Sequence, residues 1–167
     1  MRIVCKKNNE LTREELEVLY DVYSRSIKEV SIDEDDYSQV RTLNYKNTWI
    51  NDLKNNDRLL CALYYDESTF VGYILISLNE DLNYIIDFQI TKNYQGDGIT
   101  FKQMIKLVLP FTNTNKKYAG KIITYNSHAR NSFKSIGALP RNGMYEVTYS
   151  KLIGYLYKDL VSNEKNH

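Results

Sequence analysis

Residues 86–100 read IDFQITKNYQGDGIT, an apolar stretch followed by a polar one that contains two glycines. Residues 84–90 have the aromatic and β-branched content of a buried strand, and residues 91–98 have the composition of a loop. Apolar residues at helical spacing then run from Ile99 to Leu109, and Pro110 predicts the end of that helix. The stretch therefore predicts a strand that enters a glycine loop and then a helix.

The two glycines of this loop, Gly96 and Gly98, permit a tight turn with positive φ and add no Cβ. Successive main-chain amides could then approach a phosphate where the helix N-terminus adds its partial positive charge. A plain turn before a helix would show the same pattern. The loop is neither a P-loop nor a complete dinucleotide fingerprint, because no Gly-Lys-Ser/Thr and no third glycine follow.

The residues upstream predict two helices and an antiparallel meander. Thr12 and Glu15 form a capping box, so the first helix starts near Arg13, and its apolar stripe continues to about Val30. A looser helical pattern follows at 37–53. Short polar turns then separate three stretches of strand-like composition. The predicted strands are 58–65, 70–78 and 84–90.

Downstream, strand and helix patterns alternate. The predicted elements are a strand at 121–125, a helix at 127–136 that stops at Gly137, a β-like segment at 144–150, and a closing helix within 152–161, where a last strand is the alternative. We therefore predict one α/β (α+β) domain over residues 1–167, with helices covering a mixed sheet. The segment 151–161 could pack on its own sheet or on another subunit, as in a homodimer.

Composition excludes several classes of protein. Apolar residues make up 43% of the 167 residues and aromatic residues 13%, enough for a folded core. No apolar run of membrane-spanning length and no secretory signal occur, so we expect a cytoplasmic protein without a membrane partner. Cys5 and Cys61 are too isolated for a disulfide framework or a zinc site, and we expect two buried thiols and no metal.

The formal net charge of +1 conceals an asymmetry along the chain. Residues 1–83 carry 16 acidic and 10 basic side chains, whereas residues 84–167 carry 5 and 12. The first half suits a cationic ligand and the second an anionic one, although solvated faces that simply differ would show the same asymmetry. No basic cluster interleaved with aromatic residues occurs, so we expect no nucleic-acid partner.

A second motif lies at residues 126–139, which read NSHARNSFKSIGAL. The spacing puts Asn126 at the end of a strand, Ala129 and Phe133 on one helix face, and Gly137 just past the helix. By itself this motif fits a short helix with an ordinary glycine cap.

Together the two motifs resemble the GNAT superfamily of N-acetyltransferases. The phosphate loop of that family is Arg/Gln-x-x-Gly-x-Gly/Ala, and Gln95, Gly98 and Thr100 occupy those positions here. The family's second pattern is Asn-x-x-Ala-x-x-x-Tyr-x-x-x-Gly-Phe, which Asn126, Ala129, Phe133, Gly137 and Ala138 follow in register. The likeness extends over about residues 10–150, and its specific part is 86–100 and 126–138.

The resemblance implies a mostly antiparallel mixed sheet whose fourth and fifth strands splay around acetyl-CoA or a related acyl-CoA. It implies direct transfer of the acyl group to a primary amine on a small molecule or a peptide. Main-chain groups of Phe88 and Ile90, with Asn126, would hold the pantetheine, and the loop amides would hold the pyrophosphate. The residues expected at the cofactor are Phe88, Gln89, Ile90, Gln95, Gly96, Asp97, Gly98, Ile99, Thr100, Asn126 and Phe133.

One departure from the family pattern bears on catalysis. Phe133 stands where many relatives have a tyrosine that protonates the departing sulfur, and phenylalanine has no proton to give. Ser132, Tyr125 and Tyr145 are the candidate substitutes for this proton donor. The departure favours, as an alternative, a catalytically weak or inactive CoA-binding module of the same fold. An unrelated α/β interaction domain with a structural glycine turn is a further alternative.

Asp87 is our candidate for the base that deprotonates the acceptor amine. It is the only acidic residue of the strand at 84–90, where an unpaired buried carboxylate would be unfavourable. Alternatively it points to solvent or bonds a neighbouring amide, and Glu80 or Asp81 would then be the base. His128 is expected to have a surface or capping role. The tyrosines Tyr64, Tyr65, Tyr73 and Tyr84 could line an acceptor pocket or simply pack in the sheet.

Overall fold

The structure is a computed structural model that describes residues 1–30, 38–39, 41–96, 98–122 and 126–158. Its elements are β1 (Arg2–Lys7), α1 (Arg13–Val30), α3 (Leu43–Lys54), β2 (Leu59–Asp66), β3 (Thr69–Leu78), β4 (Leu82–Ile90), α4 (Thr100–Val108), β5 (Lys117–Gly120), α5 (Ser127–Ser135), β6 (Leu139–Arg141), β7 (Met144–Val147) and α6 (Tyr149–Leu156). Short 3-10 turns lie at Asn8–Glu10, Lys92–Tyr94 and Leu109–Phe111.

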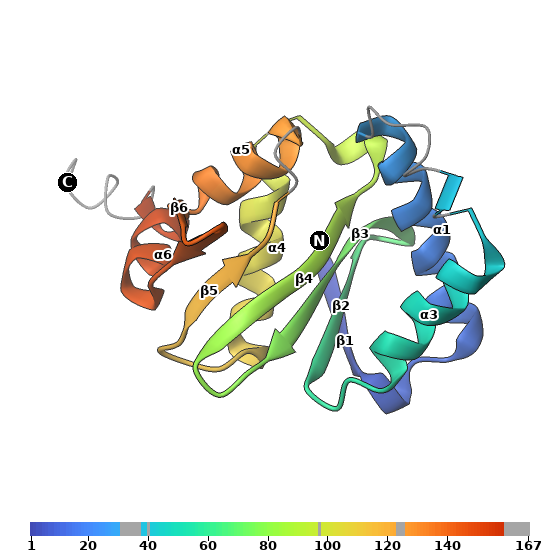
Figure 1. Ribbon diagram of the computed structural model, residues 1–167. Coiled ribbons are helices and arrows are strands. Elements are labelled where there is room, and N and C mark those ends of the chain that lie inside the picture. The colour runs from blue at the N-terminus through green and yellow to red at the C-terminus, as the bar shows by residue number, and fades with distance from the viewer. Residues whose placement is uncertain (31–37, 40, 97, 123–125, 159–167) are drawn as a thin grey trace.

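The strands form one mixed sheet in the order β1-β2-β3-β4-β5-β7-β6. All neighbouring pairs are antiparallel except β4 and β5, which are parallel. The predicted meander of three strands is therefore confirmed as β2, β3 and β4. A parallel pair needs a crossover connection, and α4 lies within the connection between β4 and β5 (Figure 1).

Helices cover both faces of the sheet, with α1 and α3 on one face and α4, α5 and α6 on the other (Figure 1). Each face has its own core. Buried side chains on the α1/α3 face include Leu16, Leu19, Ile50, Leu53, Tyr73 and Leu75. Those on the α4/α5/α6 face include Ile74, Ile85, Phe101, Met104, Phe133 and Leu152.

Local sequence signals account for the two helices that border the site. At the start of α1, Thr12 N–H donates to Glu15 Oε2 at 2.9 Å and Glu15 N–H donates to Thr12 Oγ1 at 3.1 Å, which confirms the capping box. In α4, the buried residues Phe101, Met104, Ile105 and Val108 recur at helical spacing and form the face turned to the sheet. The α-helix ends before Pro110, and one 3-10 turn follows.

Several boundaries differ from the expectations. The strand expected at 121–125 lies at Lys117–Gly120, because Tyr118 and Ala119 are the residues that enter the core beside β4; residues 123–125 lie outside the described part of the chain. Two strands, β1 and β6, were not predicted. The helix expected at 37–53 is seen at Leu43–Lys54, and 31–37 and 40 lie outside the description.

The C-terminal part of the chain separates into a strand and a helix. The β-like segment at 144–150 is β7 followed by the start of α6, and the closing helix is thus confirmed within the described residues. Leu152 and Leu156 of α6 join the core of their own chain. Cys61 is buried as expected, but Cys5 is only half-buried, and both are free thiols. No helix in the described part of the chain is long and apolar enough to cross a membrane.

Candidate active site

The sheet opens between its two parallel strands. β4 and β5 pair only from Leu82 opposite Lys117 to Ile85 opposite Gly120. Beyond this point β4 continues to Ile90, and among the described residues it pairs there with β3 alone. A cavity of about 730 Å³ occupies this opening, and its walls come from both faces of the sheet. It therefore connects the α1/α3 side to the α4/α5 side through the gap between β4 and β5.

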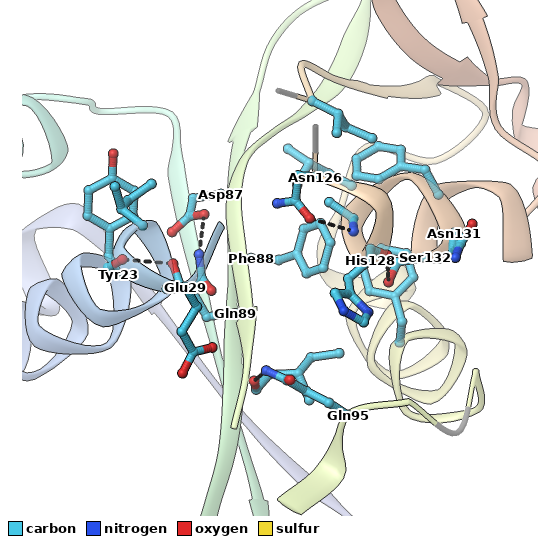
Figure 2. Close-up of a pocket in the computed structure, with 18 of the residues that line it drawn as sticks. Tyr23, Glu29, Asp87, Phe88, Gln89, Gln95, Asn126, His128, Asn131 and Ser132 are labelled. Carbon is cyan, nitrogen blue, oxygen red and sulfur yellow. Dashed lines mark hydrogen bonds between the residues drawn. The ribbon is translucent and has the colours of Figure 1, made fainter. Parts of the chain in front are cut away.

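A β-bulge in β4 decides which side chains face each end of this cavity. Opposite β3, Leu75 pairs with Asp87 whereas Ile76 pairs with Ile85, so Ile86 is the extra residue. In a regular strand, residues two apart point to the same face. Here Ile85 belongs to the core on the α4/α5 side, whereas Asp87 points to the α1/α3 side and Phe88 to the α4/α5 side (Figure 2).

The carboxylate of Asp87 is held by two neighbouring side chains. Tyr73, which is fully buried on β3, donates its hydroxyl to Asp87 Oδ2, and Gln89 Nε2 donates to Asp87 Oδ1 at 3.0 Å. The carboxylate is half-buried and lines the cavity. It is thus fixed in orientation and accessible from the α1/α3 side.

Burial raises the pKa of Asp87 to about 6, although hydrogen bonds from Tyr73, Gln89 and the main chain of Phe88 act in the opposite direction. Burial likewise raises the pKa of Tyr73 far above its usual value, and the adjacent carboxylate raises it further. Tyr73 therefore remains a protonated donor while Asp87 changes its charge. A carboxyl with a pKa near 6 is an effective proton acceptor close to neutral pH.

The glycine loop borders the other end of the cavity. Gly96 and Gly98 have φ of 86° and 66°, and a Cβ built on either would meet no atom within 4 Å. Both glycines line the cavity together with Gln95. The loop leads directly into α4, whose N-terminal dipole favours anions.

Side chains of the loop and of α5 occupy two positions that bear on cofactor binding. Gln95 Nε2 donates to the carbonyl of Ile90 at 2.6 Å, so this main-chain oxygen, expected to face the pantetheine, already has a partner. Asn126 Oδ1 accepts from the amide of Ala129 at 3.0 Å and caps α5, which leaves its amide group as a donor at the cavity wall.

Aromatic rings form the floor of the cavity on the α4/α5 side. The ring of Phe88 lies 4.6 Å from that of Phe101 and 5.8 Å from that of Phe133, measured between centroids. Phe133 is 2% exposed and also contacts the ring of Tyr145. An apolar surface next to the gap in the sheet suits the methylene and thioester part of an acyl carrier.

The architecture has close counterparts among solved structures. An acetyltransferase from Thermus thermophilus matches with a TM-score of 0.64 and 14% identity over 89% of this chain and 97% of its own. The PaiA N-acetyltransferase of Thermoplasma acidophilum, solved in complex with coenzyme A, matches with a TM-score of 0.59 and 18% identity over 89% and 100%. An acetyltransferase of the GNAT family from Streptococcus pneumoniae matches with a TM-score of 0.56 and 10% identity over 88% and 99%.

This chain has the GNAT acetyltransferase fold. The resemblance seen in the two sequence motifs is thus confirmed at the level of the fold, and an unrelated α/β fold is excluded. No protein-family model matches the sequence. None of the curated proteins matches it either.

Within this GNAT fold, most residues expected at the cofactor border one cavity. Those lining it are Phe88, Gln89, Ile90, Gln95, Gly96, Gly98, Asn126 and Phe133. Ile99 is exposed and Thr100 is buried, and neither contributes to the wall. Asp97 lies outside the described residues.

The other candidates for a catalytic role differ in whether they line the cavity. Glu80 and Asp81 are exposed and do not line the cavity. His128 lines it as an exposed residue of α5, but Asn126 rather than His128 caps that helix. Ser132 also lines it and donates its hydroxyl to the carbonyl of His128 at 3.0 Å. Tyr145 is absent from the described wall, and Tyr125 lies outside the description.

The wall on the α1/α3 side was not predicted. Tyr23, Ser26 and Glu29 of α1 and Trp49 of α3 line this end of the cavity. In the sequence, the spacing of Tyr23 and Trp49 indicates only that each belongs to the apolar stripe of a helix. None of Tyr64, Tyr65, Tyr73 and Tyr84 lines the described cavity. Tyr73 nevertheless donates a hydrogen bond to Asp87, which does line it.

Proposed function

We propose that this protein is an acyl-CoA-dependent N-acyltransferase that transfers an acetyl or related acyl group from its CoA thioester to a primary amine. The observation that carries the proposal is the cavity that passes between β4 and β5, with an anion-favouring loop on one side and a carboxylate on the other. The matching folds of known acetyltransferases support it.

The residues fit an acyl-CoA. Gly96 and Gly98 leave open space at the N-terminus of α4, where a diphosphate would bind. The Asn126 amide group and the strand edge after Ile85, free of β5, offer polar partners for the pantetheine, above the rings of Phe88 and Phe133. When bound, the thioester supplies an electrophilic carbonyl carbon and a thiol leaving group.

Direct attack is the reaction that this arrangement supports. A nitrogen–carbon bond forms, the carbon–sulfur bond breaks, and the acceptor ammonium loses two protons. Asp87, held by Tyr73 and Gln89, takes the first proton and passes it to solvent. Main-chain amides of β4 at the gap polarise the carbonyl. The second proton neutralises the departing thiolate. It reaches the sulfur through solvent, because Phe133 has no hydroxyl.

Calorimetry with acetyl-CoA tests the binding half of this proposal. Gly98→Val should weaken binding at least tenfold, because the new side chain fills the open space of the loop. Gly143→Val is the matched control: Gly143 also has positive φ, 76°, and open surroundings, but it lies in the β6–β7 turn outside the cavity. Both variants carry the same backbone strain of about 1–2 kcal/mol. Failure to bind any acyl-CoA would remove the proposal.

A CoA-binding module without turnover is the second candidate function, and Phe133 is the observation in its favour. Release of free thiol from acetyl-CoA, followed against a panel of amines, distinguishes the two functions. We expect release that depends on the amine. Tight binding with no release from any amine would favour the binding module.

A further inference from the structure

Charge divides the wall of the cavity into two unlike ends. Among the described lining residues on the α1/α3 side, the charged ones are Glu29 and Asp87, both acidic. The described lining residues of basic type are Lys121, which follows β5, and His128 on α5. In Figure 2, Tyr23, Glu29 and Asp87 lie on one side of β4 and His128 on the other. The end of the cavity that carries Asp87, the proposed base, is therefore the acidic one.

Two aromatic rings form a preorganised wall at this end. The rings of Tyr23 and Trp49 are stacked, with centroids 5.4 Å apart and planes 21° apart. The ring of Tyr20 meets Trp49 edge-on, and the Tyr23 hydroxyl lies 3.2 Å from that of Tyr45. These contacts fix the rings in place. Such a wall favours a methylene chain and also attracts a cation near the rings.

Glu29 occupies a position that α1 itself does not favour. It lies in the last turn of the helix, where the dipole disfavours a negative charge. Among the described residues it forms no ion pair, even with Arg25 one turn earlier on the same helix. Its carboxylate is exposed at the cavity wall, so a ligand can reach it.

From these observations we propose that the acceptor is a small aliphatic amine with a second cationic group. The reacting amine lies at Asp87, the methylene chain lies along Tyr23 and Trp49, and the second charge pairs with Glu29. This inference rests on the proposed N-acyltransferase function and assigns its substrate class. The transfer step is unchanged: the second ammonium is bound and keeps its protons.

Matched amines test the inference with the full-length protein and acetyl-CoA. The rate of thiol release is compared for α,ω-diamines of three to six carbons and for the n-alkylamines of equal length. We expect kcat/KM to be several-fold higher for the best diamine than for its monoamine, as an exposed ion pair with Glu29 and a cation near the rings allow. High salt should reduce this ratio, because the exposed Glu29 carboxylate is screened.

Glu29→Gln should lower kcat/KM for the diamine several-fold. The ratio of kcat/KM for the diamine to that for the monoamine should therefore fall. Glu14→Gln is the matched control, since it makes the same charge change at an exposed site in the first turn of α1, away from the cavity. It should leave the ratio as it is. Equal kcat/KM for diamines and monoamines, or a ratio that Glu29→Gln leaves unchanged, would overturn this inference but not the acyltransferase. No release with any amine would overturn both.

Discussion

The hydroxyl of Tyr73 on β3 donates a hydrogen bond to Oδ2 of Asp87 on β4, from a tyrosine that has no exposed surface. The two strands are adjacent and antiparallel, and Tyr73 is paired with Gln89, the residue that donates to the other carboxylate oxygen. A residue of the core on the α1/α3 face, Tyr73, thus fixes the orientation of the proposed base. The opposite side of the carboxylate remains open to the cavity.

Asp87→Asn should lower kcat/KM for the acceptor amine by about 10² to 10⁴, because the amide cannot accept the proton. The affinity for acetyl-CoA should stay within about twofold, since the carboxylate lies on the acceptor side of β4. Kinetics and calorimetry on the same preparation measure both. Asp81→Asn, in the exposed β3–β4 turn, is the control and should leave turnover as it is. Undiminished turnover by Asp87→Asn would rule out this base.

Tyr73→Phe should move the acidic limb of the pH–rate profile to higher pH. The proposed active form is the carboxylate, so kcat/KM rises as pH passes the Asp87 pKa of about 6. The Tyr73 hydrogen bond lowers that pKa, and its removal should raise it by about one unit, the equivalent of a hydrogen bond to a charged group.

The matched control for this variant is Tyr64→Phe. Tyr64 is also fully buried, and its hydroxyl donates to the carbonyl of Met104 at 2.7 Å on the opposite face of the sheet. Both variants lose one buried hydrogen bond, so a general loss of stability affects them alike. A limb that moves equally in both variants, or in neither, would contradict the positioning role of Tyr73.

Asp87 should also give the unfolding free energy a defined pH dependence. The carboxyl pKa rises from 3.8 to about 6 on folding, so the folded chain retains a proton that the unfolded chain has lost in this window. The stabilisation is therefore present at low pH and is lost as pH rises from about 4 to 6. Relative to Asp87→Asn, the wild-type protein should lose stability across this window and remain level above it. Denaturation followed at successive pH values measures the difference, and a constant difference from pH 4 to 7 would contradict the raised pKa.

Phe133→Tyr should raise kcat by up to about tenfold and add an alkaline limb to the pH–rate profile. The new hydroxyl would protonate the departing sulfur, a step otherwise left to solvent. The expected gain is modest because a thiol with a pKa of about 8.5 already leaves readily near neutral pH. Phe111→Tyr, on an exposed ring outside the cavity, is the control. A pH–rate profile that Phe133→Tyr leaves unchanged would contradict this prediction, because it would show that solvent already protonates the departing sulfur fast enough.

Sequence patterns anticipated the elements whose signals are local. The capping box of α1, the apolar face of α4 and the glycine loop each depend on residues within a few positions of one another. Gly137 takes the left-handed conformation expected after α5, with φ of 83°. The meander could be predicted for the same reason, because short polar turns place each strand beside the one before it.

Elements whose partners are distant in the chain were misplaced or missed. β1 forms only because β2 presents an edge to it some fifty residues later, and its own sequence, RIVCKK, is short and half polar. β5 was expected too late because its position depends on its register beside β4. A short apolar segment can satisfy several registers, and only the neighbouring strand selects one.

The sequence by itself determined the glycine loop, the helix that follows it and the presence of a single carboxylate on the adjacent strand, since backbone conformation and local periodicity depend on neighbouring residues. Only the tertiary structure decided where that carboxylate points and what holds it. The bulge at Ile86 turns Asp87 to the α1/α3 face, and long-range pairing brings Tyr73 behind it and Tyr23, Glu29 and Trp49 around it. Side-chain direction in a strand reverses with a register shift of one residue, and local sequence does not specify such a shift.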